Sequence, residues 1–162
     1  MFNTSGLTLD VIKLTKAWQL AQNAEEFFRY SEILGDALFA IRLIRLQRKG
    51  IKTKGVFHGL ENKVKKASKL LDELIRDLTN VSSGGYIRHI NLVKLLEEEL
   101  SVNDPEALKK QVSRASQELK EFLQGKRNIV ENAEEILGIL SYASRRVAHE
   151  SFRDLTLLYR QF

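Results

Sequence analysis

The most chemically distinctive part of this sequence is a run of basic residues between Arg42 and Lys69. It holds ten Lys and Arg side chains against a single acid, Glu61, so the segment carries a formal charge of +9 while the whole chain carries +5. The rest of the chain is therefore net acidic. A positive charge confined to one segment is typical of proteins that bind polyanions.

The candidate binding residues are these cations and one histidine: Arg42, Arg45, Arg48, Lys49, Lys52, Lys54, His58, Lys63, Lys65, Lys66 and Lys69. If the chain folds back after this run as a helical hairpin, the side chains converge at one end of the molecule. Each cation can then neutralise a phosphate, so the affinity should fall steeply with salt. His58 and its neighbour Phe57 can stack on an exposed base.

Other interpretations of the basic segment stay open. The same side chains could dock an acidic protein, or they could form an ordinary solvated surface. Arg42 and Arg45 could also pair internally with the acids at 97–99, and cations near a helix C-terminus complement the helix dipole in any case.

No catalytic or metal-binding pattern accompanies the basic segment. Cysteine is absent, and the three histidines lie far apart in the sequence. None of them follows a Glu in the Glu-x-x-His spacing that dimetal helical bundles use. A glycine-rich phosphate loop and a nucleophile elbow are also missing. We therefore expect a non-enzymatic protein with no catalytic residues, no metal and no cofactor.

One short string resembles a known signature. Residues 144–150, Ser-Arg-Arg-Val-Ala-His-Glu, resemble the Arg-Asn-x-x-Ala-His motif of HEPN domains, which are all-helical proteins that in many cases cleave RNA. Ser144 stands where that motif has its leading Arg, and Arg145 stands where it has Asn. The resemblance implies a degenerate ribonuclease-type domain in which Arg145 and His149 act, as a remote alternative function.

The elements that must position these residues are helices. The chain has one proline and is rich in Leu, Ile, Ala, Glu, Lys, Arg and Gln, which favour helix. Apolar residues recur at helical intervals. We predict an all-α, single-domain antiparallel bundle of six to seven helices over residues 1–162, with no sheet.

The expected helices cover residues 7–21, 24–48, 60–81, 86–100, 104–124 and 128–162, the last with a break near 149–151. Asp104 before Pro105 is a strong helix start. A basic, glycine-rich loop at 49–59 and turns at 82–85, 101–105 and 124–127 connect the helices.

Location and assembly follow from composition. No uncharged run exceeds ten residues and no secretory signal is visible, so we expect a cytoplasmic protein that does not enter a membrane. Apolar residues beyond one stripe per helix suggest a homo-oligomer or a subunit of a complex: Phe2, Trp18, Leu46, Leu157, Leu158, Tyr159 and Phe162. The predicted function is nucleic-acid binding. The alternative is a self-associating scaffold subunit that docks an acidic partner.

Overall fold

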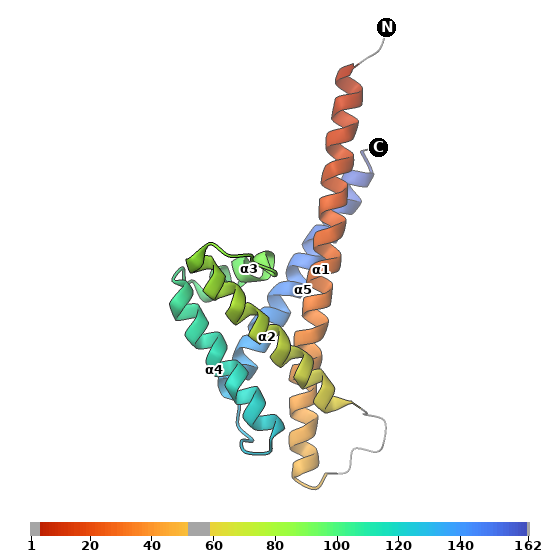
Figure 1. The fold of residues 1–162 in the computed structure, drawn as a ribbon. Helices are drawn as coiled ribbons and strands as arrows, with labels where there is room; N and C mark the ends of the chain where they lie inside the picture. The colour runs from red at the N-terminus through yellow and green to blue at the C-terminus, as the bar shows by residue number, and fades with distance from the viewer. Residues whose placement is uncertain (1–3, 52–58, 162) are drawn as a thin grey trace.

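The structure is a computed structural model that describes residues 4–51 and 59–161, with side chains described from Thr8 onward. It contains helices α1 (Thr4–Arg48), α2 (Leu60–Ser83), α3 (Ile90–Leu100), α4 (Pro105–Leu123) and α5 (Glu131–Tyr159), as Figure 1 shows. The predicted all-α class is confirmed, and no strand occurs within those ranges. None of the described helices has an apolar stretch long enough to cross a bilayer.

The expected count of six to seven helices differs from the five in the described ranges. Residues 7–21 and 24–48 belong to one continuous helix, α1. Gln22 and Asn23, at the expected boundary, do not break a helix as Pro or Gly would. The expected break at 149–151 is also missing, because α5 runs without interruption to Tyr159.

The start of α3 differs from the prediction as well. We expected a helix from Tyr86, yet α3 begins at Ile90. The carboxylate of Asp77 on α2 accepts hydrogen bonds from the backbone N–H groups of Arg88 (2.8 Å) and His89 (2.9 Å). These bonds hold the residues before Ile90 in a turn.

Two helix boundaries follow local sequence signals. Asp104 caps α4, accepting a hydrogen bond from the N–H of Glu106 at 3.1 Å, with Pro105 at the first helical position. Gly84 ends α2 in the left-handed conformation at φ 75°, and its N–H bonds to the carbonyl of Asn80. Glycine adopts this conformation without a steric penalty.

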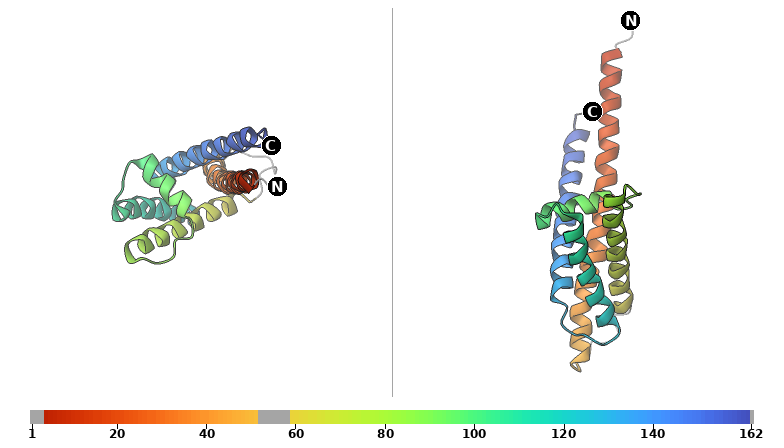
Figure 2. Two further views of the ribbon diagram at one scale, coloured as in Figure 1. Left: turned by 90° about the horizontal axis from the view of Figure 1, so that it is seen from above. Right: turned by 60° about the vertical axis from the view of Figure 1, so that its left-hand side comes forward.

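The two longest helices, α1 and α5, lie side by side and run in opposite directions (Figure 1). The shorter helices pack against the C-terminal half of α1 and the N-terminal half of α5 (Figure 2). Fully buried large side chains from all five helices form the core, among them Leu34, Ile41, Leu71, Leu74, Leu96, Leu119, Phe122, Leu137 and Leu140. Burial of this apolar surface is the main stabilising contribution.

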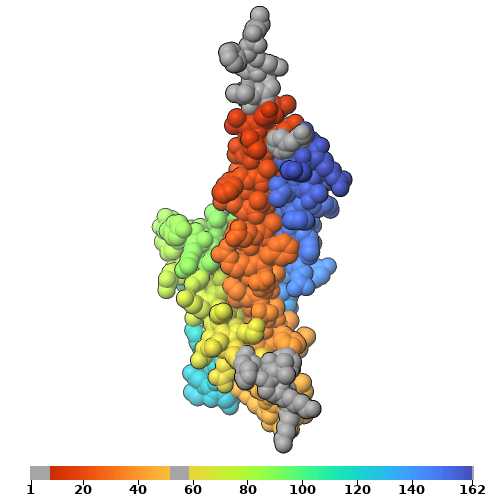
Figure 3. Space-filling view, turned by 90° about the vertical axis from the view of Figure 1, so that its right-hand side faces the viewer, coloured from red at the N-terminus to blue at the C-terminus, as the bar shows by residue number. Residues whose placement is uncertain are grey.

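Outside this body, α1 and α5 continue as a two-helix extension, which we call the arm: residues 8–25 of α1, and residues 149–159 of α5 with the turn residues 160 and 161. No residue from Thr8 to Asn23 is buried. The upper part of Figure 3 shows one face of the arm, on which no other described element covers the two helices.

Candidate functional site

Three cations of the basic segment have internal partners. Arg45 forms an ion pair with Glu134 of α5, and Lys63 pairs with Asp36 of α1 at 3.3 Å. Arg48 donates to the backbone carbonyl of Phe122 at 2.6 Å, and its guanidinium lies 4.2 Å from the centre of that ring. These interactions join the helices of the body, so these three side chains have structural roles.

Internal pairing of Arg45, one of the open alternatives, does occur, but its partner is not one of the acids at 97–99. Arg45 pairs with Glu134, and Glu99 pairs instead with Arg146 of α5. The sequence could not indicate this choice, because it depends on which helices are neighbours.

The remaining candidates divide into two groups. Lys52, Lys54 and His58, together with Phe57, lie outside the described residues. The others are exposed and make no ion pair within the described ranges: Arg42, Lys49, Lys65, Lys66 and Lys69. Arg42 lies on the side of α1 that faces α5, since Gly35, two turns earlier, sits against Ser141 of α5. Lys49 follows the end of α1, and Lys65, Lys66 and Lys69 lie on α2.

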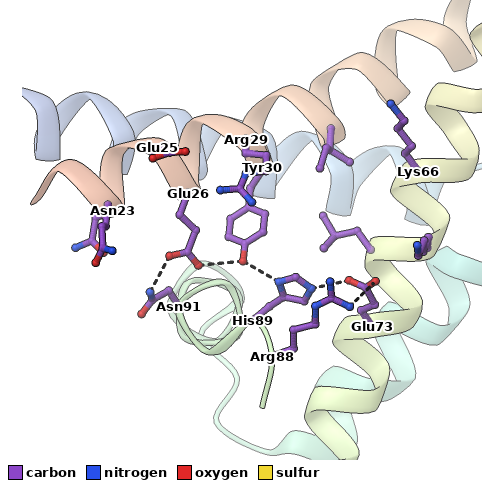
Figure 4. A pocket seen from close by; sticks show the side chains of 14 residues that line it. Asn23, Glu25, Glu26, Arg29, Tyr30, Lys66, Glu73, Arg88, His89 and Asn91 are labelled. Carbon is purple, nitrogen blue, oxygen red and sulfur yellow. Dashed lines mark hydrogen bonds and ion pairs between the residues drawn. The ribbon is translucent and has the colours of Figure 1, made fainter. Parts of the chain in front are cut away.

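Lys66 and Lys69 line a pocket of about 690 Å³ formed by α1, α2 and α3. Two further cations line it, Arg29 from α1 and Arg88 from the turn before α3 (Figure 4). The amides of Gln22, Asn23 and Asn91 add hydrogen-bonding groups. Among the described residues, Arg29, Lys66 and Lys69 have no acidic partner, so three cations here are available to an anion.

A chain of hydrogen bonds crosses the pocket wall from α1 to α2 (Figure 4). Asn91 donates to Glu26 Oε2 at 3.1 Å, and the Tyr30 hydroxyl donates to Glu26 Oε1 at 3.0 Å. The Tyr30 oxygen lies 2.8 Å from His89 Nδ1, and His89 Nε2 lies 2.6 Å from Glu73 Oε2. The chain therefore ties together the three helices that form the pocket.

Both ring nitrogens of His89 contact protein groups. Nδ1 contacts the Tyr30 hydroxyl and Nε2 contacts the Glu73 carboxylate. This histidine therefore holds the pocket wall in place.

The environment of Tyr30 disfavours ionisation of its phenol. Burial, followed by the charge and hydrogen bond of Glu26, raises the pKa of its phenol well above the ordinary value. The unfolded chain therefore loses this proton at lower pH than the folded chain, and this group's contribution to stability is lost as pH rises above about 10. In an alkaline absorbance titration, Tyr30 should ionise late, as helical circular dichroism is lost.

The control is Tyr30→Phe, which should remove the late phase. Absence of any late phase in the wild-type protein, with the helical signal intact, would contradict the assignment.

Charge patterning in the sequence pointed to Lys66 and Lys69 but missed most of the pocket. The residues missed include Arg29, Tyr30, Glu73, Arg88, His89 and Asn91. The i,i+4 spacing of Glu26 and Tyr30 on α1 is one local signal that was available. The other partners come from segments far apart in the sequence, which no local pattern connects.

The residues of the HEPN-like string lie elsewhere, on α5. Arg145 and His149 line a shallow hollow of about 500 Å³ with Tyr142 and Arg153. Ser144, where the motif would have its leading Arg, is fully buried and faces the core. An arginine at this position could not reach the hollow without rearrangement of the helices.

Among the described residues, no group of three His, Asp or Glu side chains is arranged to hold a metal ion. Comparison with protein-family models, with curated proteins and with solved structures finds no match to this chain. The fold and the pocket therefore define an all-α protein with a polar, cation-lined pocket.

Proposed function

We propose that this protein is a non-enzymatic, cytoplasmic antiparallel helical bundle that binds the backbone of RNA or DNA through its basic surface, alone or within a larger assembly. The observation that carries the proposal is the position of Lys66 and Lys69. Both lie at the pocket between α1, α2 and α3, beside Arg29, and none of the three has an ion pair among the described residues.

The electrostatics of the pocket favour an anion. Its acids are already engaged in part, because Glu73 accepts from Arg88 and His89 while Glu26 accepts from Tyr30 and Asn91. The unpaired lysines and Arg29 can neutralise phosphate, and the amides can donate to its oxygens. Lys65, exposed one residue before Lys66, can contact a neighbouring phosphate.

Binding is favoured over catalysis at this pocket for two reasons. Both ring nitrogens of His89 contact protein groups. The Tyr30 hydroxyl, which also lines the pocket, is buried between Glu26 and His89. These two groups therefore serve the pocket wall, and the pocket offers a ligand mainly charge and hydrogen bonds.

The test is fluorescence anisotropy with a labelled random oligonucleotide at about 50 and about 300 mM salt. We expect wild-type protein to bind at low salt and lose most of its affinity at high salt. Lys66→Glu combined with Lys69→Glu should weaken binding at least about tenfold at low salt. The slope of log affinity against log salt concentration should also become shallower, by the amount that about two lost phosphate contacts would give.

The matched control is Lys110→Glu with Arg114→Glu, which makes the same charge change on exposed residues of α4, away from this pocket. This variant should bind almost as the wild type does. An equal loss in both variants would show that net charge, rather than the pocket, attracts the oligonucleotide.

Three other results would contradict the proposal. Absence of binding at low salt, or full displacement of the oligonucleotide by poly-glutamate at equal charge, would favour an acidic protein partner and the scaffold function. RNA degradation that His149→Ala abolishes would favour the ribonuclease-type function at the hollow on α5.

A further inference from the structure

Large exposed apolar side chains gather on the arm. Trp18 is 65% exposed, Phe152 58% and Tyr159 76%. Leu9, Val11, Ile12, Leu14 and Leu157 of the arm are also more than half exposed. Phe2 and Phe162, which the sequence grouped with them, lie outside the described residues. A helix that exposes apolar residues over several turns is typical of one that has a partner.

The contact between Phe28 and His149 sets the register of the two helices. Their ring centres are 5.4 Å apart in an edge-to-face arrangement. Because α1 and α5 run in opposite directions, moving ten residues from each toward the arm tip places Trp18 level with Tyr159.

Helical spacing then places the exposed aromatic side chains on one face. In the arm, Ala17 is partly buried and Ser151 and Leu158 are buried, so these residues mark where α1 and α5 meet. Trp18, Phe152 and Tyr159 each follow one of them by one residue, a turn of about 100° around the helix axis. Because α1 and α5 run in opposite directions, this shared offset brings the strip of α1 that holds Trp18 and the strip of α5 that holds Phe152 and Tyr159 to the same side of the arm.

Val11 and Leu14 lie seven and four residues before Trp18, so they belong to the same strip of α1. We call the resulting surface the arm face: Val11, Leu14, Trp18, Phe152 and Tyr159.

We propose that the arm face is a self-association surface on which a second copy of this chain packs, arm against arm. The exposed parts of its five side chains amount to roughly 650 Å². A standard interface takes about 800 Å² from each partner. The arm face alone supplies most of that area, and its flanking residues can supply the rest.

Charge complementarity favours a second copy over a charged partner. The arm contains four acids (Asp10, Glu25, Glu150 and Asp154) and four bases (Lys13, Lys16, Arg153 and Arg160), so its formal charge is zero. Two basic chains can therefore meet at their arms without net repulsion. A two-fold axis would bring identical faces together and bury the aromatic side chains of both copies.

Trp18 is the only tryptophan in the chain and reports directly on this surface. We expect light scattering after gel filtration to give twice the chain mass of 18.6 kDa. Dilution from about 100 to about 1 µM should shift the Trp18 emission to longer wavelength as the dimer dissociates. Trp18→Glu should give the monomer mass and weaken association at least about 100-fold.

The matched control is Ile129→Glu, since Ile129 is similarly exposed but lies before α5, far from the arm. This variant should remain dimeric. Tyr159→Ser, followed by tryptophan emission and circular dichroism, provides a second test that does not depend on the folding of Trp18→Glu. It should weaken the dimer while the helical signal is retained.

Several results would overturn the proposal. These are a wild-type monomer at 100 µM, an Ile129→Glu variant that dissociates as readily as Trp18→Glu, and a Tyr159→Ser variant that stays fully dimeric. A monomer whose Trp18 emission shifts only when phosphatidylcholine vesicles are added would assign the arm face to a lipid surface.

Discussion

Asp77→Ala should lower the free energy of unfolding by about 3 kcal/mol, because two backbone donors would lose their acceptor. Asp77 is 2% exposed, and its two carboxylate oxygens accept from the N–H groups of Arg88 and His89. In the variant these N–H groups have no protein acceptor, and the turn that carries His89 into the pocket is no longer held. The measurement is chemical denaturation followed by circular dichroism.

The same variant should affect the proposed binding site. His89 contacts Tyr30 and Glu73, so release of its turn should disconnect the hydrogen-bond chain across the pocket. Oligonucleotide affinity, measured where the variant is still folded, should fall severalfold. Asp77→Asn keeps one oxygen acceptor and should lose less stability than Asp77→Ala.

Asp72→Ala is the control on the same helix. Asp72 accepts from Ser116 and Lys120 but is nearly half exposed, so water can replace its contacts and the loss should stay below about 1 kcal/mol. Equal losses for Asp72→Ala and Asp77→Ala would show that the backbone hydrogen bonds of Asp77 do not hold the turn.

Glu118→Ala should cost about 3 kcal/mol as well, at the opposite end of the body. Glu118 of α4 is 4% exposed and accepts from the backbone N–H of Ala133 at 2.9 Å, in the first turn of α5. It also accepts from Asn132 Nδ2 at 3.1 Å and pairs with Arg127 at 3.3 Å. No described side chain caps α5 at Val130, so this carboxylate serves the start of that helix from a neighbouring one.

Glu121→Ala provides the comparison for Glu118. Glu121 lies on the same helix and pairs with the same arginine, at 3.0 Å, but makes no backbone contact with α5. We expect its removal to cost less than about 1 kcal/mol in the same denaturation experiment. A Glu118→Ala variant as stable as Glu121→Ala would mean that α5 does not need this cap.

The candidate site was predictable only in part. The localised charge drew attention to Lys66 and Lys69, which do line the pocket. The same charge pattern also selected Arg45, Arg48 and Lys63, whose partners lie on other helices. Charge along a sequence does not reveal which cations are neutralised, because the neutralising groups come from segments 27 to 89 residues away.

The sequence by itself determined the helical class, the cap of α4 at Asp104 and the glycine that ends α2. These features depend on residues within one or two turns of each other. Only the tertiary structure decided that α1 is unbroken, that Asp77 delays the start of α3, and that Arg29, Lys66 and His89 share one pocket. The physical reason is that apolar spacing gives each helix a buried face, whereas the packing of side chains between helices decides which faces meet.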